Sequence, residues 1–193
     1  MKFYLLIFLV AAAVTYLTVP LVRQFALATG TLAPVRERDV HEFPTPRLGG
    51  VAMGVGFLAA LAIASHTPFL ADAASFHNVK GLAVGVVLIV ILGVIDDIWD
   101  LDWYTKLAGQ ILVAGLMSWL GIQLTSFPIF GVTIGSSRLS LLVTVLVVVA
   151  AINAVNFVDG LDGLASGMMA ISATGLFIYS YTLSVSYTHL TLP

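Results

Sequence analysis

The chain has 193 residues, of which 60% are hydrophobic and 9% are charged. Soluble domains carry roughly 25% charged residues, so this composition excludes a soluble globular protein and indicates an integral membrane protein. The net charge of −2 supplies no basic field for nucleic acid, and the absence of cysteine excludes disulfides and thiolate chemistry.

Six apolar segments approach the roughly 20 residues that a membrane-spanning helix needs. They predict spans near residues 3–22, 48–65, 81–95, 107–124, 140–155 and 164–183. The first segment is interpreted as a retained helix rather than a signal peptide, because no convincing cleavage site follows it. We therefore expect residues 1–185 to form one all-α polytopic membrane domain. Residues 186–193 are interpreted as a tail that is foreign or marks a truncation.

If the spans alternate across the bilayer, the loops at 23–47, 96–106 and 156–162 share one side. Five of the eight basic residues lie there, four of them in the first loop, which predicts that this side is cytoplasmic. Nine of the ten acidic residues lie on the same side, as they would if they built a shared site. On the other side, β-branched residues and glycines between 125 and 138 predict a small extracytoplasmic β-hairpin.

A cluster of carboxylates ends the third apolar segment: Asp96, Asp97, Asp100 and Asp102. Ionisable groups are costly beside hydrocarbon and usually mark function there. Asp96 and Asp97 follow the apolar run directly, and an opened helix end would let both converge as a metal ligand beside a base. Asp100 and Asp102 are interpreted as a polar helix end in water. Lys106 either holds a diphosphate or pairs with Asp102 at i,i+4.

Polar residues also recur at intervals of three near the end of the fifth segment: Asn153, Asn156, Asp159 and Asp162. Nine residues turn an α-helix through about 180°, so the four cannot share one straight face. A break marked by Gly160 and Gly163 is expected to turn the later acids inward. Helix capping explains one of the four, whereas four together indicate a site for a metal or a nucleotide.

A connector rich in proline and glycine precedes the second apolar segment and reads Pro-Thr-Pro-Arg-Leu-Gly-Gly at residues 44–50. Its arginine, Arg47, offers a planar fork that suits phosphate. The paired glycines let a backbone pass closely or expose amide groups. A connector that only maintains the topology is the alternative interpretation.

These three elements, in this order, resemble the polyprenyl-phosphate N-acetylhexosamine-1-phosphate transferases over about residues 36–167. The form of the 44–50 motif resembles the GlcNAc-1-phosphate branch more than the phospho-MurNAc-pentapeptide translocases of peptidoglycan synthesis, which remain the alternative. Family members have about ten spans, with a further aspartate and a His/Arg-bearing loop downstream. The resemblance therefore implies a truncated member that holds about six of these spans. Whether this shorter chain is active by itself is left open.

The resemblance implies transfer of GlcNAc-1-phosphate from a UDP-N-acetylhexosamine to polyprenyl phosphate, with release of UMP, at the cytoplasmic face of a bacterial inner membrane. Mg²⁺ is the implied cofactor, with Mn²⁺ as an alternative, and a homodimer is left open. The implied catalytic residues are Asp96 and Asp97, and the implied metal ligands are Asp97 and Asn156. The implied substrate-binding residues are Thr45, Arg47, Lys106, Asn153, Asp159 and Asp162. Direct attack and a phosphoryl-enzyme route both stay open.

Two other classes of protein fit parts of the sequence. A cation-coupled transporter also carries carboxylates in its helices, but it places them near the bilayer midplane between repeats. Here the carboxylates gather at one predicted interface, and no internal repeat is apparent. A non-catalytic membrane scaffold leaves the clustering of acids unexplained.

Overall fold

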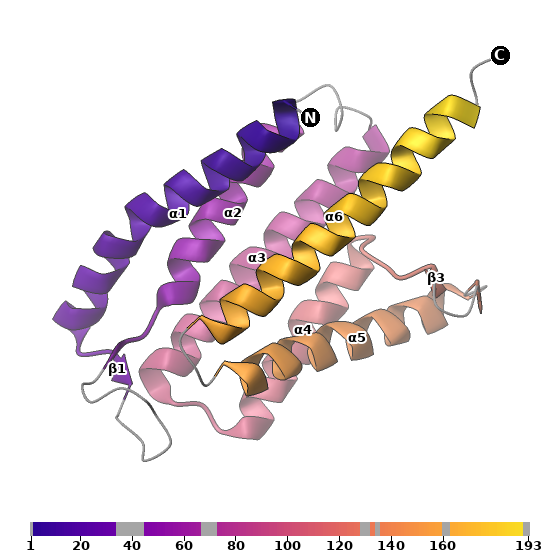
Figure 1. The fold of residues 1–193 in the computed structure, drawn as a ribbon. Helices are drawn as coiled ribbons and strands as arrows, with labels where there is room; N and C mark the ends of the chain where they lie inside the picture. The colour runs from indigo at the N-terminus through magenta and orange to yellow at the C-terminus, as the bar shows by residue number, and fades with distance from the viewer. Residues whose placement is uncertain are drawn as a thin grey trace. The chain divides into compact units, whose positions relative to one another are not determined.

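The structure, a computed structural model, describes residues 2–33, 45–66, 73–127, 132–133, 136–159 and 163–190. Its architecture is all-α (Figure 1), with helices α1 (Lys2–Thr29), α2 (Gly49–Ser65), α3 (Ala73–Trp99), α4 (Trp103–Trp119), α5 (Ser137–Val158) and α6 (Leu164–Leu190). Two antiparallel pairs of two-residue strands accompany them: β1 (Leu32–Ala33) with β2 (Thr45–Pro46), and β3 (Ser126–Phe127) with β4 (Val132–Thr133).

Four helices in the described part of the chain are long and apolar enough to cross a membrane. These spans are Phe3–Thr29, Val79–Trp99, Ser137–Val158 and Leu164–Thr182. Helix α2 is apolar but has only 17 residues. The protein is therefore a multi-pass membrane protein, and the full count of six spans stays a prediction.

Four of the six helices, α1, α3, α5 and α6, extend past the predicted spans, whereas α2 matches its span closely and α4 is shifted toward the N-terminus. Helix α1 continues seven residues past the predicted boundary at 22, and α3 begins at Ala73 and ends at Trp99. Helix α6 runs through Leu190, past the predicted end of the span at residue 183. Hydropathy marks only the apolar part of a helix, whereas backbone hydrogen bonds continue until a capping residue or a turn ends them.

The chain divides into two compact units, and the first contains the described residues up to Ala150. In this unit α1 packs on α2, α2 on α3, and α3 on α4 (Figure 1). Glycines permit these close crossings, as small residues commonly do between membrane helices. A Cβ atom added to Gly54 would lie 2.6 Å from Cγ2 of Val90, and one added to Gly85 would overlap Met117.

Three pairs of glycines stand at four-residue spacing, Gly50/Gly54, Gly81/Gly85 and Gly163/Gly167, and only some of them are packing sites. Gly54, Gly81 and Gly85 lie at close approaches between helices. Their counterparts Gly50, Gly163 and Gly167 have no atom within 4 Å of an added Cβ, so nothing in the described chain packs there.

The second unit begins at Ala151 and contains the end of α5 and all of α6. Helix α5 ends at Val158, and Gly163, with a φ of 77°, directly precedes α6. A positive φ suits glycine, which carries no Cβ. The predicted helix break is confirmed, although Gly160 and Asp162 lie outside the described residues.

A tight turn joins α3 to α4. Asp100, with a φ of 49°, ends α3, and Asp102 then caps α4 by accepting hydrogen bonds from the Thr105 hydroxyl at 2.7 Å and the Thr105 N–H at 3.4 Å. The hydroxyl bond, helped by the backbone bond, lowers the pKa of Asp102. The carboxylate therefore stabilises the start of α4 at neutral pH, and this contribution is lost as the pH falls through the lowered pKa.

The β3–β4 pair lies where the sequence predicts a hairpin, with Ser126 opposite Thr133 and Phe127 opposite Val132. Side chains of α5 hold the segment just before it. The Ser140 hydroxyl donates to the Leu124 carbonyl at 2.6 Å, and the Leu124 N–H donates to the Thr144 hydroxyl at 2.9 Å. Its position outside the cytoplasm stays a prediction.

Candidate functional site

The motif at 44–50 is held by the end of α1. Gly30, with a φ of 70°, ends α1 in a Schellman motif, in which the Thr31 N–H donates to the Ala26 carbonyl at 3.0 Å. The backbone carbonyl of Thr31 then accepts a hydrogen bond from the Arg47 N–H at 3.1 Å, next to the β1–β2 pair. The described end of the motif therefore has a fixed place beside the start of α2.

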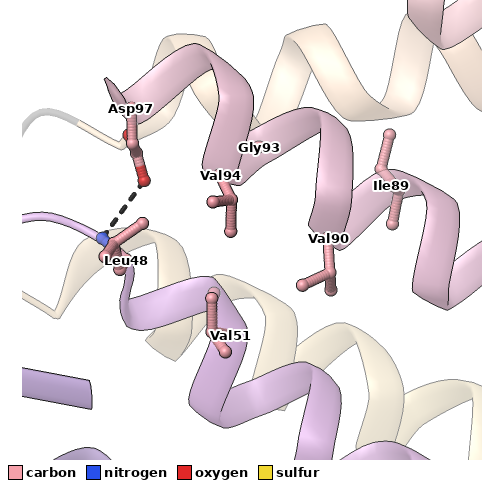
Figure 2. A pocket seen from close by; sticks show the side chains of 8 residues that line it. Leu48, Val51, Ile89, Val90, Gly93, Val94 and Asp97 are labelled. Atoms are coloured by element: carbon pink, nitrogen blue, oxygen red, sulfur yellow. Dashed lines mark hydrogen bonds between the residues drawn. The ribbon is translucent and has the colours of Figure 1, made fainter. Parts of the chain in front are cut away.

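Leu48 links this motif to the carboxylate cluster. Its backbone is left-handed, with a φ of 75°, and its side chain is buried, so packing offsets the strain of this conformation. Leucine has no polar group with which to cap α2. Instead, Oδ2 of Asp97 on α3 accepts the Leu48 N–H at 3.1 Å (Figure 2). A carboxylate at the first turn of a helix also interacts favourably with the helix dipole.

Asp97 lies at one end of an apolar pocket between α2 and α3. The pocket has a volume of about 230 Å³, and Figure 2 shows Val51 of α2 facing Val90 and Val94 of α3 across it. Its other lining residues include Gly50 and Gly93, which leave backbone uncovered. Oδ1 of Asp97 has no hydrogen-bond partner among the described residues. This oxygen is therefore available to a ligand.

Asp96 and Asp97 diverge, and the expectation that an opened helix end brings them together is wrong. Helix α3 stays regular through Trp99, so neighbouring side chains point about 100° apart. While Asp97 meets α2, Oδ2 of Asp96 pairs with Nζ of Lys106 on α4 at 2.6 Å. The alternative pairing of Lys106 with Asp102 is also wrong, because Asp102 is engaged in capping α4.

Two cations accompany these carboxylates. Besides Lys106, Arg47 lies 3.7 Å from Oδ1 of Asp100, measured from Nη1. The Asp100 side chain is 84% exposed, so this ion pair contributes little and leaves Arg47 able to bind another anion. The exposure of Asp100 confirms that it belongs to a polar helix end in water.

The donor set fits a hard divalent cation that also binds substrate. Among the described residues, no three His, Cys, Asp or Glu side chains gather into one cluster. Mg²⁺ is usually held by one or two carboxylates together with substrate phosphates and water, rather than by a complete protein cage. Asp97, with one oxygen fixed by Leu48 and the other unengaged, suits such a role.

The remaining predicted site residues lie in other parts of the structure. Thr45 pairs through its backbone with Ala33. Asn153 and Asn156 lie in the last turns of α5, Asp159 follows in the turn, and Asp162 lies outside the described residues. These last four belong to the second unit, so their approach to Asp97 stays a prediction.

Sequence reasoning missed Leu48, whose N–H fixes Asp97. A signal for it exists in the sequence: the residue before Gly49 starts a helix yet has no side chain that can cap it. A helix start without its own cap needs a partner from elsewhere. The partner itself lies 49 residues away, and only the α2–α3 crossing identifies it.

Comparison with known proteins identifies the family. Residues 79–192, more than half of the chain, match the model of glycosyl transferase family 4. The chain is 42% identical over 182 residues to the decaprenyl-phosphate N-acetylglucosaminephosphotransferase of Mycolicibacterium smegmatis. The aligned region covers 91% of this chain and 44% of that protein. The Mycobacterium tuberculosis protein of the same name is 39% identical over 180 residues, which cover 91% of this chain and 45% of that protein.

A more distant relative is the probable undecaprenyl-phosphate N-acetylglucosaminyl 1-phosphate transferase of Bacillus subtilis. It is 29% identical over 123 residues, which cover 63% of this chain and 32% of that protein. No solved structure matches the chain.

The chain belongs to glycosyl transferase family 4. It spans less than half the length of the mycobacterial relatives that it matches. Membership of a transferase family favours the transferase over the transporter and scaffold alternatives.

The Asp96–Lys106 pair gives a stability prediction. The side chains are 22% and 31% exposed, so the pair is more shielded than a surface ion pair. We expect Lys106→Gln to lower the free energy of unfolding by about 1 kcal/mol. Unfolding in detergent, followed by circular dichroism, would measure this. In a double-mutant cycle, Lys106→Gln should cost little once Asp96→Asn is present, and fully additive losses would contradict the pairing.

Proposed function

We propose that this chain forms part of an enzyme that transfers GlcNAc-1-phosphate from UDP-GlcNAc to a polyprenyl phosphate, releasing UMP. The observation that carries the proposal is the Leu48–Asp97 contact, because it joins the 44–50 motif to the carboxylate cluster at one place. The names of the mycobacterial and Bacillus relatives support the acceptor and the transferred group. We place the site on the cytoplasmic face of a bacterial inner membrane, following the distribution of basic residues.

The reaction joins two anions, so placement and charge neutralisation are its main requirements. An oxygen of the lipid phosphate attacks the phosphorus that carries the sugar, and the bond from that phosphorus to the bridging oxygen breaks, leaving UMP. Arg47 and Lys106 offset the repulsion between the phosphates. The lipid phosphate is already largely anionic near neutral pH, so Asp96, which pairs with Lys106, contributes modestly as a base.

Asp97 is the residue that we assign to Mg²⁺, or to Mn²⁺ in its place. Bound there, the cation would neutralise phosphate charge as a Lewis acid. We propose Asn156 as a second ligand, with Asn153, Asp159 and Asp162 ordering the nucleotide and Thr45 contacting substrate. The regular α5 carries both amides toward its end, and Asp159 follows in the turn after it.

The proposed function is tested with a chimera of the Mycolicibacterium smegmatis relative in which this chain replaces the matching segment. Membranes that contain the chimera are supplied with radiolabelled UDP-GlcNAc, decaprenyl phosphate and Mg²⁺. We expect the label to enter the lipid fraction and UMP to be released in equal amount.

Two controls sharpen this assay. The unmodified relative shows that donor and acceptor are competent, and an immunoblot shows that the chimera is present in the membrane. Absence of transfer by a stably inserted chimera would count against the proposal. Labelling by UDP-MurNAc-pentapeptide in place of UDP-GlcNAc would instead move the chain to the translocase branch.

A further inference from the structure

Helix α4 has only 17 residues, and it is not among the described helices that are long and apolar enough to cross a membrane. Its packing is nevertheless that of a spanning helix. Among the described helices it packs extensively only on α3. Three close contacts between the two helices follow in antiparallel register: Gly109 with Leu92, Met117 with Gly85, and Leu120 with Gly81. Helix α4 therefore runs beside the apolar span Val79–Trp99 for most of its length.

The polarity of α4 is the reverse of that of a helix in water. Half of its buried residues are polar, since Gln110 and Ser118 are buried together with Val113 and Ala114. Its exposed face carries apolar and aromatic side chains at helical spacing, which we call the α4 stripe: Tyr104, Ala108, Ile111, Leu112, Leu116 and Trp119. A helix that faces water exposes its polar side chains and buries its apolar ones. The α4 stripe therefore suits contact with lipid.

Aromatic rings mark both ends of α4. Trp103 is its first residue and Trp119 is its last, and these residues are 64% and 82% exposed. Trp103 also stacks on Tyr104. Tryptophan and tyrosine gather at membrane–water interfaces, because one end of each ring is apolar and the other is polar. A rise of about 1.5 Å per residue places the two tryptophans about 24 Å apart along the helix.

Helix α3 gives the same length from a different feature. Its uncharged stretch lies between Lys80 and Asp96, which are also about 24 Å apart along the axis. The hydrocarbon core of a typical bilayer is about 30 Å thick. Tilting a helix shortens its projection on the membrane normal, so tilt does not remove the difference. A bilayer commonly thins around a span that is too short for it.

We infer that α4 is a lipid-facing span and that the hydrocarbon beside α3 and α4 is thinned to about 24 Å, so that this sector associates best with phospholipids of short acyl chain. Lipid fits the α4 stripe better than another helix does, because contacts between membrane helices are enriched in small residues. The stripe carries the large side chains of Leu112, Leu116 and Trp119, whereas Gly109 lies at the contact with α3. A thinned sector would bring the phosphate level of the bilayer toward Asp96 at the end of α3.

The test uses the 193-residue chain in phospholipid vesicles. The chain has three tryptophans, so variants that keep a single one report its depth through fluorescence quenching by brominated lipids. Two variants replace Trp99 and one end of α4 with phenylalanine, which leaves either Trp103 or Trp119. We expect bromine near the headgroup to quench both about two-fold more strongly than bromine near the end of the acyl chain. Leu112→Trp, in a chain whose native tryptophans are all replaced with phenylalanine, is the matched control at the middle of the stripe and should show the reverse.

Competition between brominated and unbrominated lipids then measures the preference for chain length. We expect lipids with acyl chains of about 14 carbons to compete about three-fold better than lipids with about 22 carbons. Trp119→Leu should move the preference toward longer chains, because Leu120 then extends the apolar stretch. Leu112→Ile, which changes neither end of the stripe, should leave the preference unchanged.

Three outcomes would overturn the inference. One common depth for all three positions would show that α4 does not cross the bilayer. A tryptophan at position 112 that no brominated lipid quenches, in a membrane-bound chain with wild-type helicity, would show that protein covers the stripe. Equal or better competition by the long-chain lipids would show that the bilayer is not thinned. The readout requires no transfer reaction, so it is independent of the proposed function.

Discussion

Replacing Asp97 with asparagine is expected to lower the transfer of GlcNAc-1-phosphate by about 100-fold or more, while the protein stays folded. The asparagine carbonyl can still accept the Leu48 N–H, so the contact between α3 and the start of α2 survives. What is lost is the negative charge, and with it the ligand for a divalent cation. Transfer of radiolabel to decaprenyl phosphate by the chimera measures the effect.

Asp100→Asn is the matched control for this substitution. It removes a carboxylate of the same cluster, three residues away, whose side chain is 84% exposed and outside the pocket. We expect near-normal transfer from this variant. If Asp97→Asn kept near-normal transfer as well, Asp97 would have no part in the chemistry.

The second large effect concerns the packing of α1 on α2 at Gly56. A Cβ atom added there would overlap the Thr15 hydroxyl and would lie 2.8 Å from the Ala11 carbonyl oxygen. A side chain can rotate away, but the carbonyl belongs to the α1 backbone and cannot. We therefore expect Gly56→Ala to lower the free energy of unfolding by about 1–3 kcal/mol, against the general preference of helices for alanine.

Thermal unfolding in detergent measures this loss, with Gly115→Ala as the control. Among the described residues, no atom outside the local helix lies within 4 Å of a Cβ added to Gly115, so alanine there should be neutral or stabilising. Adding Thr15→Ala to Gly56→Ala should recover only part of the lost stability, because the carbonyl contact remains. Unchanged stability of Gly56→Ala would show that α1 and α2 do not pack this closely.

Much of the fold could be predicted because lipid imposes a simple requirement on sequence. A span needs a long apolar run, and each predicted run corresponds to a helix. The ends could not be predicted from apolarity alone, since they depend on local features such as the Gly30 motif and the Asp102 cap.

The candidate site was predictable in composition but not in geometry. Clustered aspartates predict that the end of α3 belongs to the candidate site, yet their partners depend on how helices cross. Lys106 reaches Asp96 because the left-handed turn at Asp100 reverses the chain and sets α4 against α3. The spacing of four residues between Asp102 and Lys106 suggested a local pair, and tertiary packing overrode it.

We propose that the end of α3 and the turn after α5 meet at one site, and a distance measured between them tests this proposal. The chain has no cysteine, so spin labels can be placed cleanly at Ile98→Cys and Phe157→Cys, both at exposed positions. Double electron–electron resonance on the 193-residue chain should give a 98–157 distance under about 20 Å, as ligands of one cation require. A distance of about 30 Å or more, the thickness of the hydrocarbon core, would exclude a cation shared by the two segments.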